Sequence, residues 1–292
     1  MSSEIETSFT VDWISATFDP EQYTNLMFGL HDGVSLSRVK AVPTRGYTQA
    51  IELESGLRLN WHEANEGQGM HMVASGSCLR WYYAHGKDWR ELFAVIDSCG
   101  GRTSRVDLAF DVKNTKLSPV DLCKPNLRAY KGKGRTPKFN ALLGGDGSWT
   151  LYIGSRSSEK MLRIYDKAKE QGDYASDYIR IELETKGEVA RAVGWNFARE
   201  ATASCMGMAL GLVKGVADFD LAAWDRSLSG NVVGFSLPQG KARDTFGWLV
   251  KVCAPALAKE IEKHPKEGVL DAFWGALKAE LGARGITVSD EA

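Results

Sequence analysis

Three segments of the chain alternate apolar and polar residues with a period of two, which is the pattern of a β-strand with one buried face. Alternation is strict over 105–112 and 178–184, and it recurs less regularly over 160–166. In each segment the apolar side is continuous enough to lie against a core, and the other side carries charged residues. We predict strands in all three.

Shorter patterns predict the elements around these strands. Further strands are expected at 11–18, 46–54, 56–62, 70–82, 138–143 and 149–154. Helices are expected at 20–30, 87–99 and 118–130, with a Gly-containing basic loop after the last of them. This order predicts an α+β fold, an antiparallel sheet with helices packed on it.

Helical spacing dominates the chain after Gly187. One helix is expected over 188–203, and others are expected at 241–263 and 268–281. The stretch between 216 and 238 resembles a junction. The sequence therefore predicts an α+β domain over 1–215, followed by a helical C-terminal region over 216–292.

Charged residues are unevenly distributed along the chain. The whole chain has a net charge of −1, but residues 101–169 hold 15 Lys or Arg and 6 Asp or Glu, a net charge of +9. Both flanking regions are acidic. A basic block of this size favours an anionic partner such as nucleic acid, with an ordinary solvated surface as the alternative.

Composition narrows the class of protein. A hydrophobic content of 43% and a charged content of 25% are typical of a soluble globular chain. We find no apolar run of transmembrane length and no signal-peptide pattern at the N-terminus, so we expect a cytoplasmic protein without a membrane partner. The five cysteines are scattered, which predicts reduced thiols and neither a zinc site nor a disulfide framework.

The polar faces of the three alternating strands carry the candidate chemistry. They present Arg105, Asp107 and Asp111; Arg163, Tyr165 and Lys167; and Arg180, Glu182 and Glu184. If these faces meet on one side of a sheet, they assemble a phenol, carboxylates that suit Mg²⁺ or Mn²⁺, and cations that suit a phosphate. Such a set fits phosphoryl transfer in which Tyr165 attacks and becomes a phosphotyrosine.

Arg163, Lys167 and a metal ion would favour the phenolate form of this tyrosine. The alternative is structural, because a half-exposed sheet commonly carries alternating polar residues and cross-strand Arg–Glu pairs.

The sequence also resembles a known family. The run YIGSRSS at 152–158 leads into LRIYDK at 162–167 and then IRIEL at 179–183, and RVDLAFD at 105–111 precedes them. Together with GMHMVASG at 69–76, these runs resemble replication initiation factors of the Rep_trans type, which are related to HUH endonucleases. The resemblance covers roughly residues 10–200.

That resemblance implies a site-specific endonuclease and ligase that starts rolling-circle replication of a phage or plasmid in a bacterial cell. Tyr165 would form the covalent 5′-phosphotyrosine, with Arg163 and Lys167 beside it. Asp107 and Glu182 are the preferred ligands for Mg²⁺ or Mn²⁺, and Asp111 and Glu184 are further candidates. HUH enzymes hold their metal with paired histidines, and this chain has no such pair.

The expected partner is origin DNA, single-stranded or supercoiled, together with a host helicase and polymerase; a homodimer stays open. Seven basic residues are candidates for DNA contacts: Lys131, Lys133, Arg135, Lys138, Arg156, Lys160 and Arg180. Two alternatives remain. One is a conjugative relaxase of an integrative element with the same chemistry, and the other is a sequence-specific DNA-binding protein that has lost cleavage.

Overall fold

The structure is a computed structural model that describes residues 5–30, 38–63 except 45, 69–114 and 138–216. Beyond these it describes only 258, 261–263, 268, 271–272, 274–276 and 278–279. The chain divides into two compact units, Met1–Leu237 and Pro238–Ala292. The helix expected at 118–130, the loop 131–137 and most of the helices expected after 216 lie outside the described residues.

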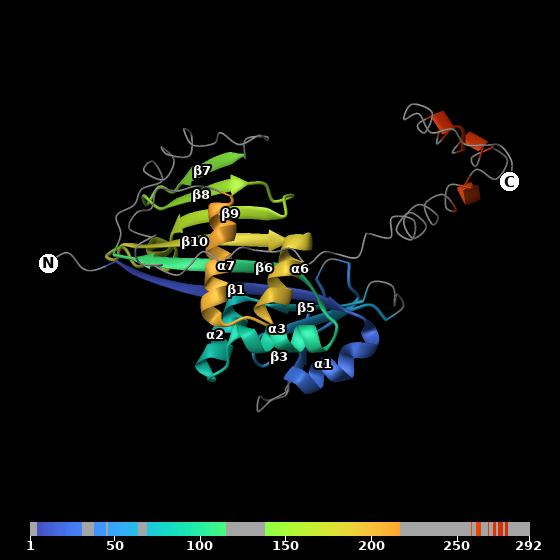
Figure 1. Ribbon diagram of the computed structural model, residues 1–292, viewed down its shortest axis with the longest axis horizontal. Coiled ribbons are helices and arrows are strands. Elements are labelled where there is room, and N and C mark those ends of the chain that lie inside the picture. Colours follow the sequence, from blue (N-terminus) through green and yellow to red (C-terminus); the bar gives the residue numbers. More distant parts are fainter. Residues whose placement is uncertain are drawn as a thin grey trace. The chain divides into compact units, whose positions relative to one another are not determined.

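Among the described residues of the first unit, ten strands form one antiparallel sheet, as the sequence predicts for an α+β fold (Figure 1). Their order across the sheet is β2 (Arg38–Lys40), β3 (Gln49–Leu53), β4 (Arg58–Trp61), β5 (Met70–Ala74), β1 (Glu6–Phe18), β6 (Arg102–Lys113), β10 (Tyr178–Lys186), β9 (Lys160–Asp166), β8 (Trp149–Gly154) and β7 (Phe139–Leu143). Strands β1 and β6 are at the centre, and long-range pairing places β10 beside β6, although a long stretch of chain separates the two.

The described helices of this unit are short and follow the strands. They are the 3₁₀ turn η1 (Pro20–Gln22), α1 (Tyr23–Leu30), α2 (Gly76–Ala84), α3 (Trp89–Ser98), α5 (Lys167–Glu170), α6 (Gly187–Phe197) and α7 (Thr202–Lys214). Helix α3 begins with a capping box, in which Asp88 accepts from the Arg90 backbone N–H and Glu91 accepts from that of Asp88. None of the described helices has the length and hydropathy needed to cross a membrane.

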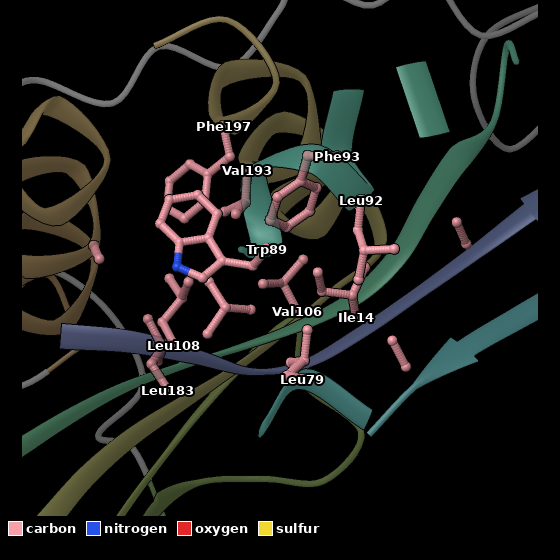
Figure 2. Packing of buried hydrophobic residues seen from close by; sticks show 14 of the residues in the cluster. Ile14, Leu79, Trp89, Leu92, Phe93, Val106, Leu108, Leu183, Val193 and Phe197 are labelled. Carbon is pink, nitrogen blue, oxygen red and sulfur yellow. The ribbon is translucent and has the colours of Figure 1, made fainter. Parts of the chain in front are cut away.

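The core lies between the apolar face of the sheet and the helices. Trp89 and Phe93 of α3 meet Phe197 of α6 at ring-centroid distances of 5.3 and 5.6 Å (Figure 2). These rings lie over Val106 and Leu108 of β6, which are fully buried, with Leu183 of β10 close by. Burial of this apolar face fixes the register of β6 and β10 and directs their alternate residues to the opposite, polar face.

Two predictions of secondary structure were wrong. The strand expected over 70–82 ends at Ala74, and residues 76–84 form α2 instead. Cys78, Leu79 and Tyr82 are buried at helical spacing, a period that the apolar run before them had concealed. The helix expected over 188–203 is two helices, because the chain leaves α6 after Phe197 and begins α7 at Thr202.

The other differences are small. Strand β2 was not anticipated, and β1 and β6 are longer than expected. Strands β7, β8 and β9 fall within a residue or two of their predicted bounds. The three described cysteines, Cys78, Cys99 and Cys205, are buried free thiols, as predicted.

Candidate active site on the polar face of the sheet

Strands β6, β10 and β9 are neighbours, and their registers bring the three predicted polar faces together. Tyr165 of β9 lies opposite Arg180 of β10, which lies opposite Asp111 of β6. Two residues further along β10, Glu182 lies opposite Arg163. Cross-strand partners share one face of a sheet, so the assumption that these side chains meet is correct.

The phenol of Tyr165 is almost completely buried, at 6% exposure. Its hydroxyl donates a hydrogen bond to Glu182 Oε2 at 3.3 Å. The guanidinium carbon of Arg163 lies 4.9 Å from the centre of the ring. Lys167 begins helix α5 and is not part of the strand, but its Nζ still lies 5.5 Å from the same ring centre. A buried tyrosine is therefore flanked by both predicted cations.

Burial and the neighbouring Glu182 carboxylate raise the pKa of Tyr165 well above its usual value, because both oppose the phenolate. Arg180 and Arg163 act in the opposite direction but do not outweigh them. Arg163 therefore favours the phenolate, as expected, but burial and Glu182 outweigh it. The hydroxyl is the donor in the hydrogen bond to Glu182.

Arg163 holds Glu182 across the strand pair. Its Nη2 donates to Oε1 at 2.6 Å and to Oε2 at 2.7 Å. The side chain of Glu182 is 6% exposed, while that of Arg163 is 37% exposed. One end of this pair is therefore fixed in the protein, and the other reaches solvent.

A second cluster lies further along the same strands. Arg105 donates through Nε to Asp107 Oδ1 at 2.8 Å, and its Nη2 lies 2.9 Å from Glu184 Oε2. Lys186 also pairs with Glu184. Burial raises the pKa of Asp107 to about 6, with Glu182 and Glu184 adding to this effect and Arg105 opposing it.

The third cluster is centred on Arg180, which is 7% exposed. Its Nε donates to Asp111 Oδ1 at 2.6 Å, and its Nη1 lies 3.3 Å from Asp12 Oδ1. Asp12 belongs to β1 and was not among the predicted site residues. It lies where the β1–β6 register shifts, between Val11 and Trp13, so simple alternation does not reveal its direction.

The four carboxylates predicted as metal ligands have the hard oxygen chemistry that Mg²⁺ or Mn²⁺ prefers. Among the residues that the structure describes, however, no group of three His, Cys, Asp or Glu side chains could hold a metal ion. Asp107, Asp111, Glu182 and Glu184 are each paired with an arginine. This arrangement does not fit a divalent ion.

The predicted DNA-contacting residues fall into three groups. Lys138 and Arg156 are exposed, and Lys160 is partly exposed at the start of β9. Arg180 is buried between two aspartates and is not free to reach a phosphate. Lys131, Lys133 and Arg135 lie outside the described residues.

The raised pKa of Asp107 predicts a pH-dependent contribution to stability. The folded protein binds this proton more tightly than the unfolded chain, whose carboxyl has an ordinary pKa near 3.8. Stability from this group is therefore highest below pH 4 and falls as the pH rises to about 6. Relative to Asp107→Asn, the wild-type free energy of unfolding should fall by roughly 3 kcal/mol over that interval.

Urea unfolding of both proteins at pH 4, 5, 6 and 7.5 measures this difference. Glu52→Gln, which removes a partly exposed carboxylate paired with Arg58, is the control for general effects of pH. A constant difference between wild type and Asp107→Asn at all four pH values would contradict a raised pKa.

The strands that carry this site lie in a part of the chain that is similar to a known protein family. The model of the replication initiation factor family, Rep_trans, matches residues 101–223. That match contains β6, β9, β10 and every predicted catalytic residue. Residues 101–223 are similar to replication initiation factors. The resemblance inferred from the sequence is confirmed.

Two relatives extend the comparison beyond that family region. The chain is 26% identical over 305 residues to a protein of Bacillus subtilis (strain 168) named "Putative DNA relaxase NicK", covering 93% of this chain and 86% of the relative. It is also similar to the solved structure of a rolling circle replication initiator protein from Geobacillus stearothermophilus. That match has a TM-score of 0.57 and 19% identity, and it covers 74% of this chain and 86% of the other. At this identity the second comparison concerns the fold alone.

Proposed function

We propose that the protein is a DNA nicking and joining enzyme that starts rolling-circle replication of a phage or plasmid, with Tyr165 as its nucleophile. The observation that carries this proposal is the position of Tyr165 in the family region. Its buried phenol contacts a carboxylate and lies between Arg163 and Lys167. The similarity of residues 101–223 to replication initiation factors supports DNA as the substrate.

In the proposed reaction, Tyr165 Oη attacks the phosphorus of one DNA strand. A bond forms between Oη and phosphorus, and the bond from phosphorus to the 3′ oxygen breaks. The phenol gives its proton to water, and water in turn gives a proton to the departing 3′ oxygen, so no proton is gained or lost overall and the products are a 5′-phosphotyrosine and a free 3′-OH. Attack by a 3′-OH on the phosphotyrosine reverses these changes and joins the strand.

The cations beside Tyr165 suit this chemistry. Lys167 Nζ and the Arg163 guanidinium lie on the ring that would carry the phosphate, and positive charge there stabilises the extra negative charge of the transition state. Exposed Arg156 and Lys138 would contact flanking phosphates and position the strand without reading its sequence. A requirement for Mg²⁺ or Mn²⁺, and recruitment of a host helicase and polymerase, stay predictions.

The test is incubation of the purified protein with a supercoiled plasmid that carries the replication origin of its own replicon, in Mg²⁺ or Mn²⁺ and in EDTA. We expect a nicked plasmid with protein joined to the 5′ end, detected as a labelled band after nuclease digestion and denaturing electrophoresis. A plasmid without the origin is the control. Binding of origin DNA without any adduct in either metal would favour the non-catalytic DNA-binding alternative.

A second candidate function is a relaxase that starts conjugative transfer. Similarity to a protein named as a DNA relaxase over 93% of this chain favours it. The chemistry is the same, so the DNA decides between the two. Nicking of a transfer origin in preference to a replication origin, with both placed on otherwise identical plasmids, would identify a relaxase.

A further inference from the structure

Glu182 accepts a hydrogen bond from the hydroxyl of Tyr165, the proposed nucleophile. It is a buried carboxylate at the centre of β10, and three hydrogen bonds converge on it. Two come from Arg163 Nη2, at 2.6 and 2.7 Å, and the third comes from the hydroxyl of Tyr165 at 3.3 Å. Both carboxylate oxygens are engaged within the protein.

The hydrogen bond from Tyr165 determines where its oxygen points. A phenol has one proton, and donating it to Glu182 fixes the rotation of the hydroxyl. The lone pairs of the oxygen are then directed away from the carboxylate and remain available to an incoming phosphorus. Holding a nucleophile in the attacking orientation is worth a large part of a catalytic barrier.

Arg163 reaches the nucleophile through the same carboxylate. Its Nη2 is committed to Glu182, and its guanidinium lies 4.9 Å from the centre of the Tyr165 ring. Glu182 would otherwise be free to change rotamer, because its other cross-strand neighbour on this face, Ala109, is small and apolar and offers it no hydrogen bond. The arginine therefore supports the carboxylate, and the carboxylate supports the phenol.

We propose that Glu182 is a positioning residue for Tyr165, held in place by Arg163, and that it does not serve as a metal ligand. This inference rests on the proposed function, because it assigns a role within the same site. It replaces the role that the sequence had suggested for Glu182. Its support is the arrangement of three hydrogen bonds and the failure of the described carboxylates to form a metal-binding group.

The proposal is tested with Glu182→Gln and Glu182→Met in the adduct assay. Glutamine keeps an oxygen that accepts from Tyr165, so we expect it to retain the rate within about tenfold of wild type. Methionine has a similar length and no strong acceptor, and it should lower the rate on the order of 100-fold. The Mn²⁺ concentration that gives half the maximal rate should be the same for Glu182→Gln as for wild type.

The role of Arg163 is tested with a double-mutant cycle. If Arg163 holds Glu182 in place as well as stabilising the transition state, the loss of rate in the Arg163→Met/Glu182→Met double variant should be smaller than the sum of the two single losses. Fully additive losses would contradict the support of Glu182 by Arg163. Thermal unfolding of each variant verifies that it is folded, and Glu182→Gln preserves the test if Glu182→Met is not.

Two outcomes would overturn the proposal. One is loss of the adduct in Glu182→Gln together with its recovery at higher Mn²⁺, which is the behaviour of a metal ligand. The other is equal activity of the glutamine and methionine variants, which would mean that the hydrogen bond has no effect. Tyr165→Phe in the same assay distinguishes these two outcomes from failure of the proposed function. If this variant still forms the adduct, Tyr165 is not the nucleophile.

Discussion

Replacing Tyr165 with phenylalanine should eliminate the covalent protein–DNA adduct. The substitution removes the only atom of the side chain that can bond to phosphorus and leaves the ring in place. We expect no adduct above background, a loss of at least about 1,000-fold, because the two described residues directly opposite Tyr165, Thr150 and Arg180, are not tyrosines and could not take over its role. Labelled origin DNA and denaturing electrophoresis measure the adduct, and peptide mapping locates the phosphotyrosine.

Tyr152→Phe is the matched control. Tyr152 lies on the neighbouring strand β8, opposite Arg163 and on the same face, but it does not contact Glu182 through any hydrogen bond that the structure describes. This variant should still form the adduct. Tyr165→Phe should remain folded, since it loses one hydrogen bond at a cost of about 1 kcal/mol. An adduct of unchanged amount in Tyr165→Phe would refute the proposed nucleophile.

The sequence could predict this face of the sheet because strict alternation is a direct consequence of strand geometry. Val106, Leu108 and Phe110 are all fully buried, so Asp107 and Asp111 must point the other way. The same argument placed Tyr165 and Glu182 on the polar sides of their strands. Adjacency of the three strands required the assumption of one sheet, which the registers confirm.

The ion pairs could not be predicted from the sequence. Alternation with a period of two shows which face of the sheet a side chain is on, but it does not show which residue lies beside it. Arg180 was predicted to contact DNA because it is basic, yet it is buried and paired with Asp111 and Asp12. Asp12 was hidden by the register shift in β1. The break between α6 and α7 had no signal either, since residues 198–201, Ala-Arg-Glu-Ala, contain neither glycine nor proline.

Arg180 gives the second large prediction, and the effect is on folding. Arg180→Met leaves Asp111, which is 9% exposed, without its cation and weakens the hold on Asp12. Removing one partner of a buried ion pair leaves an uncompensated charge, which typically costs about 3–5 kcal/mol. We expect the free energy of unfolding in urea to fall by that amount at neutral pH, with loss of the fold at moderately raised temperature.

The control is Arg156→Met, which changes an exposed arginine in the loop between β8 and β9. Because Arg156 is proposed to contact DNA, its replacement should lower the affinity for DNA more at low salt than at high salt. The free energy of unfolding should stay within about 0.5 kcal/mol of the wild-type value. Arg180→Met should show the opposite pattern, and adding Asp111→Leu should recover part of its stability because the unpaired charge is then gone. Wild-type stability in Arg180→Met with weakened DNA binding would instead make Arg180 a DNA contact, against its burial in the sheet.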